Sequence, residues 1–267
     1  PGITSGEKIL AVAYQEARSR YDLHRVTTQA SAEGDEWRLS GEKIQVLDGQ
    51  NADALIVSAR TAGEQNDQDG ITLFLITPDT PGLSIRPQTR VDSRAAALVT
   101  LVGVKVGAAS IVGTPDQGLQ PLSRIVDLAT VGLSAEMLGG MSQIFDDTLE
   151  YLKTREQFGV AIGSFQALKH RAAKVFMEIE LCRSSVMAAA NAADDGDADL
   201  ALLVSLAKAR CSDAFILATN ESVQMYAGIG MTDEHDAGFY LKRARATEMT
   251  FGDTAWHRDR WARLRGY

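Results

Sequence analysis

A short stretch near the middle of the chain carries residue types that could hold a nucleotide. Arg155, Gln157 and Phe158 come just before Gly159, which ends a long helical pattern. A guanidinium can bind a phosphate, while an aromatic ring and an amide can contact an adenine or a flavin edge. Ser164 is a plausible N-cap for the next helix, so these groups would lie at a helix–helix corner. An ordinary helical hairpin with Phe158 in its core is the more common reading of such residues, and both readings stay open at this point.

A second candidate site is the segment Gln224-Met225-Tyr226-Ala227-Gly228-Ile229-Gly230. Its glycines would let the backbone approach a pyrophosphate, and Gln224 would offer an amide to it. A Gly-x-Gly that follows a helical pattern is usually only a C-cap. The segment therefore indicates a phosphate site only in combination with the Arg155 corner.

The elements that must position these residues fall into two parts, of which the first, from Pro1 to about Gly113, is rich in β pattern. Turn residues at Gly34-Asp35, Ser40-Gly41 and Asp48-Gly49 separate short apolar runs. Closely spaced strands with almost no helix between them predict an antiparallel sandwich or barrel. The predicted strands are residues 10–14, 27–30, 37–40, 43–47, 54–59, 71–76 and 97–102.

The second part has a helical pattern rich in alanine, leucine and methionine. The apolar spacing predicts helices at about 117–155, 165–194, 198–228 and 235–265, which is typical of a four-helix bundle. We therefore predict an α+β protein with a β-rich domain at 1–115 and a helical domain at 116–267. Alanines at 188–193 and leucines at 200–206 make the helix faces broadly apolar. That breadth predicts a dimer or tetramer.

Composition limits the classes of partner. The 267-residue chain has 45% hydrophobic and 23% charged residues and a formal net charge of −8, which argues against nucleic-acid and anionic-membrane partners. No apolar run reaches transmembrane length and no signal peptide opens the chain, so we predict a cytoplasmic protein. Cys182 and Cys211 lack ligand spacing. They are expected to be buried thiols, and we predict neither a disulfide nor a metal site.

Together the two candidate segments resemble motifs of acyl-CoA dehydrogenases, flavoproteins of fatty-acid and sterol side-chain breakdown. The resemblance rests on Arg-x-x-Phe-Gly at 155–159, on Phe165-Gln166, and on the segment 224–230, where Ala227 replaces a glycine. It covers essentially the whole chain and implies the family's middle and C-terminal domains, with the helical N-terminal domain absent. It also implies that FAD bound to a neighbouring subunit is held by Arg155, Gln157, Phe158, Gln166, Gln224, Gly228 and Gly230.

The family's reaction, as the resemblance implies it, removes a proton next to a thioester carbonyl while a hydride passes to the flavin. A carboxylate must serve as the base. The positions that match the family's glutamates hold Gly252, near the C-terminus, and Ala129, on the first long helix. Asp253 is the nearest substitute base. It is also a suitable N-cap for the final helix, and we favour the cap over the base.

Two further departures concern the side of the site that would face the flavin ring. The stretch from Lys43 to Gly49 resembles the family's flavin-contacting strand, but Gln45 and Leu47 replace its aromatic residue and its hydroxyl donor. The loop at 14–22 keeps acidic residues but lacks the glycine that lets backbone reach the ring. The half that would bind the ADP part of FAD thus resembles the family more closely than the half that would face the reaction.

Three hypotheses follow, in order of preference. The chain is a subunit that gives FAD-binding residues to a catalytic acyl-CoA dehydrogenase partner in a homo- or hetero-oligomer. Alternatively, it is a divergent, active dehydrogenase that uses Asp253 as its base. In the third, it is a flavin-free interaction scaffold. The first two imply an acyl-CoA thioester substrate and an electron-accepting flavoprotein, and a yellow purified protein would separate them from the third.

Overall fold

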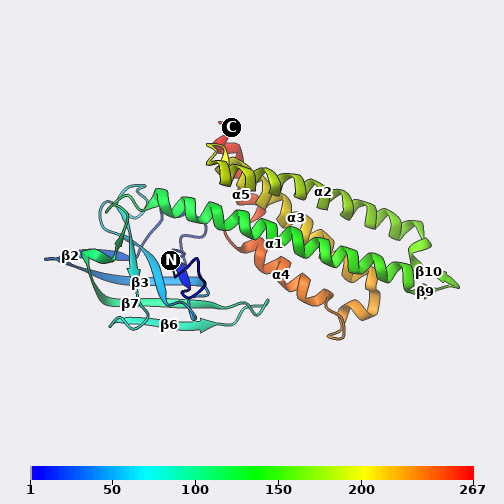
Figure 1. Cartoon of the computed structure of the whole chain (residues 1–267), viewed down its shortest axis with the longest axis horizontal. Helices are drawn as coiled ribbons and strands as arrows, with labels where there is room; N and C mark the ends of the chain where they lie inside the picture. Colours follow the sequence, from blue (N-terminus) through cyan, green and yellow to red (C-terminus); the bar gives the residue numbers. More distant parts are fainter. Residues whose placement is uncertain (1) are drawn as a thin grey trace. The chain divides into compact units, whose positions relative to one another are not determined.

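The chain divides into a sheet unit, Pro1–Ile125, and a helical unit, Val126–Tyr267. The computed structural model describes residues 2–267, and Figure 1 shows the strands of the first unit and the helices of the second. The long helix α1 (Leu119–Thr154) begins in the sheet unit and continues through the helical unit. The predicted boundary at residue 115 precedes this helix.

The sheet unit contains one eight-stranded sheet, in the order β6-β7-β3-β2-β4-β5-β8, with β1 paired to β4. Most neighbours are antiparallel, as predicted, but β1 pairs with β4 in parallel and β2 has a short parallel pairing with β4. The sheet is therefore mixed. The strands are β1 (Leu10–Ala13), β2 (Gln29–Glu33), β3 (Glu36–Leu47), β4 (Ala54–Arg60), β5 (Ile71–Ile76), β6 (Leu83–Gln88), β7 (Ala96–Gly107) and β8 (Ile111–Val112).

Besides the two parallel pairings, three details of the sheet differ from the prediction, one of which is the short strand β8, which no predicted strand covers. Residues 37–40 and 43–47 belong to one strand, β3, and the predicted turn at Ser40-Gly41 is instead a register shift within it. A Cβ on Gly41 would lie 2.5 Å from Thr28 Oγ1, so the glycine allows close approach between neighbouring strands. The third difference is β6, which the prolines of its region had hidden. It lies at the end of the strand order, where Pro87 is tolerated.

A buried arginine organises the loops beside β4. The Arg60 guanidinium donates hydrogen bonds to the carbonyl oxygens of His24, Gln65, Asp67 and Asp69 at 2.6–3.0 Å. Backbone carbonyls in irregular segments must find donors when water is excluded. One side chain thus supplies donors to two separate loops.

The helical unit confirms the predicted four-helix domain, with its last helix in two parts. After α1 come α2 (Gln166–Asp195), α3 (Leu200–Tyr226), α4 (Ala237–Met249) and α5 (Thr254–Leu264). The predicted helix at 235–265 is interrupted because Phe251 and Gly252 adopt φ values of 60° and 120°, which no α-helix contains. The core of the helical unit joins α1, α2, α3 and α4 through residues such as Met141, Val175 and Phe215.

Both cysteines lie in this core as free thiols, which confirms that they are buried. None of the helices formed by the described residues is long and apolar enough to cross a membrane.

Candidate functional site

The Arg155 corner is an exposed hairpin that follows α1. Two short strands, β9 (Glu156–Gln157) and β10 (Val160–Ala161), pair across Phe158 and Gly159, which have φ values of 57° and 77°. The Phe158 side chain is 92% exposed, so the alternative with Phe158 in a helical-hairpin core is wrong. Its ring contacts Phe165 edge-on, with 6.1 Å between ring centroids. An aromatic residue held in solvent at a positive φ is uncommon and suits a contact with another molecule.

The other corner residues are also accessible. The backbone of Arg155 is fixed by hydrogen bonds with Tyr151 and Ile162, whereas its guanidinium has no partner within residues 2–267. Gln157 donates to the Glu156 carbonyl, and Gln166 lies exposed at the start of α2. The corner therefore presents an amide, a ring and a cation that has no partner among the described residues, on a short hairpin turn.

The segment 224–230 lies where α3 gives way to a short 3₁₀ helix, η3 (Ala227–Met231). Gln224 is exposed, and a Cβ on Gly228 would meet no atom within 4 Å, so the backbone there is open to approach. Gly230 is closely packed, because a Cβ there would lie 2.8 Å from that of Tyr226, and its contact with a cofactor stays a prediction. Ala227, at φ 56°, holds a conformation that would suit a glycine.

Aromatic packing ties the two segments to one end of the helical unit. The rings of Tyr151, near the end of α1, and Tyr226, at the end of α3, lie 4.7 Å apart between centroids. Both belong to a small cluster with Ile144 and Ala237. The structure thus anchors the two sequence-predicted segments to neighbouring helix ends, while their shared role in binding a ligand stays a prediction.

Neither of the two positions that match the family's glutamates, Gly252 and Ala129, holds a carboxylate, and the nearby acids have structural partners. Asp253 Oδ1 accepts a hydrogen bond from Trp256 N at 2.9 Å, which confirms the predicted N-cap of α5. Near Ala129, Asp127 binds Arg260 through both carboxylate oxygens, at 2.7 and 2.9 Å. Asp253 as a base stays a prediction.

In the sheet unit, a buried ion pair joins the loop at 14–22 to β3. Glu16 binds the Lys43 Nζ at 2.7 Å and accepts hydrogen bonds from Thr27 and Thr28. Burial alone would raise the pKa of Glu16, but the Lys43 charge and these hydrogen bonds lower it to about 2. Burial lowers the pKa of Lys43 to about 8. The two segments that would face a flavin ring are therefore tied together, although Gln45 and Leu47 remain unlike the family.

Comparison with known proteins follows the same two units. The family model of the acyl-CoA dehydrogenase middle domain matches residues 11–103, and that of the acyl-CoA dehydrogenase C-terminal domain matches residues 116–264. The chain belongs to the acyl-CoA dehydrogenase family.

Relatives of this acyl-CoA dehydrogenase family member cover nearly all of its length. It is 30% identical over 259 residues to mitochondrial isovaleryl-CoA dehydrogenase of Pongo abelii, covering 94% of this chain and 60% of the relative. It is 29% identical over 253 residues to the probable acyl-CoA dehydrogenase YngJ of Bacillus subtilis, covering 94% and 66%. The chain thus spans about two thirds or less of these relatives.

Solved structures show the same fold. Butyryl-CoA dehydrogenase from Megasphaera elsdenii superposes with a TM-score of 0.95 at 26% identity, covering 100% of this chain and 70% of that one. A solved FAD-dependent dehydrogenase gives a TM-score of 0.94 at 27% identity, covering 100% and 72%.

Sequence reasoning missed two buried residues beside the α4–α5 turn of this family member. The Lys208 Nζ donates to the carbonyl oxygens of Gly252 and Glu248 at 2.7 and 3.1 Å and to Ser212 Oγ at 3.1 Å. His257 Nε2 lies 3.1 Å from the Phe251 carbonyl oxygen. Burial lowers the pKa of Lys208 to about 8, and burial with the nearby Lys208 and Arg260 charges lowers that of His257 to about 3. A lysine in a helical pattern predicts a solvated side chain, so no sequence signal indicated this arrangement.

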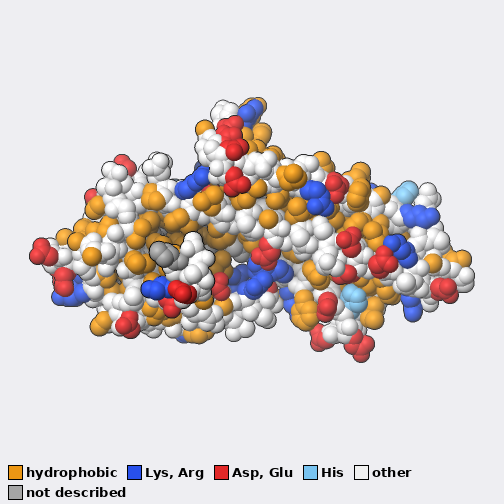
Figure 2. All heavy atoms as spheres, in the orientation of Figure 1, with side chains coloured by type: hydrophobic (Ala, Val, Ile, Leu, Met, Phe, Trp, Pro, Cys, Tyr) orange, Lys and Arg blue, Asp and Glu red, His pale blue; other side chains and the backbone are white. Residues whose placement is uncertain are grey.

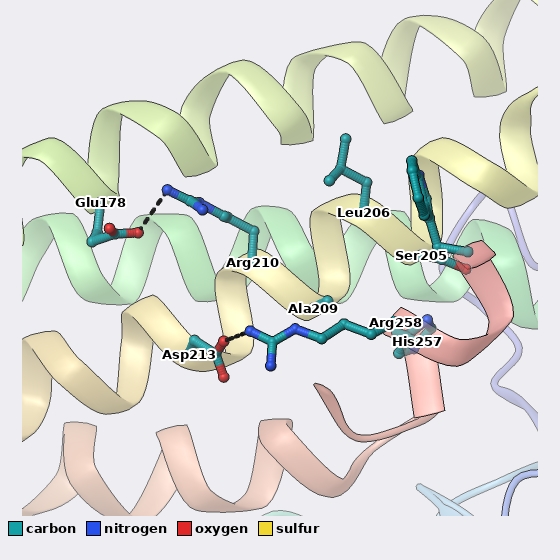
Figure 3. A pocket seen from close by; sticks show the side chains of 9 residues that line it. Glu178, Ser205, Leu206, Ala209, Arg210, Asp213, His257 and Arg258 are labelled. Carbon is teal, nitrogen blue, oxygen red and sulfur yellow. Dashed lines mark hydrogen bonds and ion pairs between the residues drawn. The ribbon is translucent and has the colours of Figure 1, made fainter. Parts of the chain in front are cut away.

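A cavity of about 280 Å³ opens between α2, α3 and α5 and was also missed. Figure 3 shows Arg210 reaching Glu178 on one side and Arg258 reaching Asp213 on the other, at 3.0 and 2.5 Å. Ala209 also lines the cavity. Because its lining comes from three separate helices, only the fold brings these residues together.

No group of three or more His, Cys, Asp or Glu residues in the described part of the chain could hold a metal ion.

Proposed function

We propose that this chain is a subunit of an acyl-CoA dehydrogenase-type flavoprotein assembly and gives FAD-binding residues to a catalytic partner. The observation that carries the proposal is the corner itself, where a nearly fully exposed Phe158 stands beside an Arg155 guanidinium without a partner in the described residues. Both residues lie at a turn, and both side chains are exposed instead of packed in the chain's own core. They suit a ligand that another subunit also contacts.

The residues present fit the ADP part of FAD. Arg155 would bind the diphosphate, Phe158 would pack on a ring, and Gln224 would donate or accept at the open backbone near Gly228. Gln157 and Gln166 would supply further amides from the same corner, and Gly230 would keep the backbone beside Gly228 close to Tyr226. FAD, when bound, would supply the hydride acceptor of the assembly.

The proposed substrate is an acyl-CoA thioester of lipid or sterol side-chain catabolism, which the assembly would dehydrogenate between the α and β carbons. Gly252 and Ala129 leave this chain without a carboxylate at either family position, so the base would come from the partner. An electron-transferring flavoprotein would take up the electrons. A solved structure named for the electron transferring flavoprotein of Acidaminococcus fermentans contains a chain with the same fold, at 27% identity and with a TM-score of 0.94 over 98% of this chain and 70% of that one. A cytoplasmic location remains a prediction.

The decisive experiment measures flavin in the assembled protein. Arg155→Ala should lower FAD occupancy severalfold while changing thermal stability little, because the guanidinium has no packing role in the fold. Lys153→Ala is the matched control, because among the described residues the Lys153 side chain pairs only with exposed Glu150. Absorbance near the flavin band and calorimetric melting are the two readouts.

Each result separates the hypotheses. A colourless protein, purified with or without its partner, would support the flavin-free scaffold. If the chain alone bleaches its flavin with acyl-CoA, and Asp253→Asn abolishes the bleaching, the divergent dehydrogenase is favoured. If Arg155→Ala melts early with unchanged flavin content, Arg155 is structural and the proposal fails.

A further inference from the structure

The turn between α4 and α5 leaves no room for a side chain at residue 252. Gly252 has a φ of 120°, a conformation that residues with a Cβ rarely adopt. A Cβ placed on it would lie 2.7 Å from both His257 Nε2 and Trp256 Cε3. Contacts of a Cβ with other heavy atoms at this distance do not occur unless a neighbouring group moves. The backbone and the packing therefore both exclude a larger residue.

Two buried side chains hold this backbone conformation. His257 Nε2 must carry the proton toward Phe251, since a carbonyl oxygen can only accept, and Lys208 donates to the Gly252 carbonyl. Their exposed fractions are 1% and 0%, so water cannot replace either donor. The two carbonyls belong to the peptide planes on either side of the Gly252 Cα. Fixing both planes fixes the dihedral angles of Gly252.

We propose that Lys208 and His257 are positioning residues that close residue 252 to any side chain, so that a glutamate restored there would not become a base. The inference rests on the proposed function in one respect, the assignment of residue 252 as a family base position. Replacing Gly252 by glutamate would then not restore the base, because several contacts around residue 252 would also have to change.

The second family position provides a contrast. Ala129 lies within the regular helix α1 and is only partly buried. Glutamate is a good helix former, and no special backbone angle is needed there. The structure therefore accepts Ala129→Glu and rejects Gly252→Glu, although both changes introduce the same side chain.

A double-mutant cycle tests the steric part without any reference to flavin. The melting temperature of Gly252→Ala should fall by roughly 5–10 °C. Gly196→Ala is the control for backbone strain, because Gly196 has a φ of 68° and nothing within 4 Å of a Cβ, and it should lose roughly half as much or less. In a His257→Ala background the additional loss from Gly252→Ala should shrink, because the clashing ring is gone. Additive losses, or equal losses in the two glycine variants, would overturn the proposal.

Glutamate variants provide a second arm if His257→Ala does not fold. Ala129→Glu should melt within roughly 2 °C of the unchanged protein, and Gly252→Glu should melt well below it. In the partner-assembled, flavin-loaded protein, Gly252→Glu should add no anaerobic flavin bleaching with acyl-CoA thioesters. Bleaching that appears with Gly252→Glu, or melting equal to that of Ala129→Glu, contradicts the closure. An assembly without flavin would instead count against the proposed function, while the melting comparison still decides the closure.

Discussion

At the scale of single residues, His257 makes the helical unit sensitive to acid. Its folded pKa of about 3 lies below its ordinary value of 6.5 because the ring is buried among cationic neighbours. Between these values the unfolded chain binds a proton that the folded chain does not. The stability contributed by the neutral ring is therefore complete above pH 6.5 and is lost as the pH falls below it.

We therefore expect the free energy of unfolding to decline between pH 6.5 and pH 5, with a slope that approaches about 1.4 kcal/mol per pH unit toward the lower end. Urea unfolding at several pH values measures it. His257→Gln keeps an N–H that can donate to Phe251 but does not titrate, so its slope in this window should be flatter. Glu16, with a folded pKa of about 2 against 4.5, contributes its own loss only as the pH falls below about 4.5. An unchanged slope in His257→Gln would exclude the ring as the cause.

The candidate site shows what residue types can and cannot predict. Arg155, Phe158 and Gln224 stand out in the sequence because a turn or a glycine follows each of them closely. Their exposure is a property of the turn at 158–159, which the sequence leaves open. Lys208 and His257 could not be found, since their partners are backbone carbonyls of a turn that only the packed helices create.

At the scale of elements, Arg60 is the main support of the loops beside β4. Removing it would leave several carbonyl oxygens without donors. Water could not easily replace the guanidinium there, because the Arg60 side chain is almost wholly buried. Arg60→Met should therefore cost about 3 kcal/mol or more of the free energy of unfolding. Arg86→Met on the exposed edge strand β6 is the control and should change stability by less than about 0.5 kcal/mol. Denaturant unfolding compares the two, and similar losses would mean that Arg60 is dispensable.

Element prediction succeeds where local pattern and tertiary packing agree. The strand at 71–76 and the helices α1, α2 and α3 follow from unbroken apolar periodicity. Strand β3 was predicted in two pieces because Ser40-Gly41 has turn residues, yet Gly41 serves a close strand approach. The sequence has no proline that would predict the break between α4 and α5. The break depends on two residues at positive φ that buried donors from α3 and α5 hold in place.

At the scale of the whole molecule, the outer surface of α2 favours association. Four of its large apolar side chains are each at least half exposed: Phe176, Met177, Leu181 and Met187. Figure 2 shows hydrophobic side chains at the surface of the helical unit among the charged ones. Exposed apolar groups of this kind usually lie in an interface.

We expect a dimer or tetramer by light scattering at micromolar concentration, and a smaller species for Met187→Glu, because a buried, unpaired charge would weaken the contact. Asp35→Lys, on the exposed turn between β2 and β3, is the control and should leave the assembly unchanged. A monomer in the unchanged protein would refute the expectation directly. The apolar breadth of the helices is visible in the sequence, but which side of α2 stays uncovered depends on how the bundle packs.

The placement of the two thiols has a practical consequence for studying how this chain opens. Both cysteines belong to the core of the helical unit, and the sheet unit contains none. The hydrogen bond with Cys182, together with burial, raises the pKa of the Cys211 thiol. Only the thiolate form of a cysteine attacks an alkylating reagent. Neither sulfur should react until α2 and α3 separate. The rate of thiol labelling therefore reports the opening of the helical unit alone. If the strands unfold first, the β-sheet signal in circular dichroism would be lost while both thiols remain unlabelled.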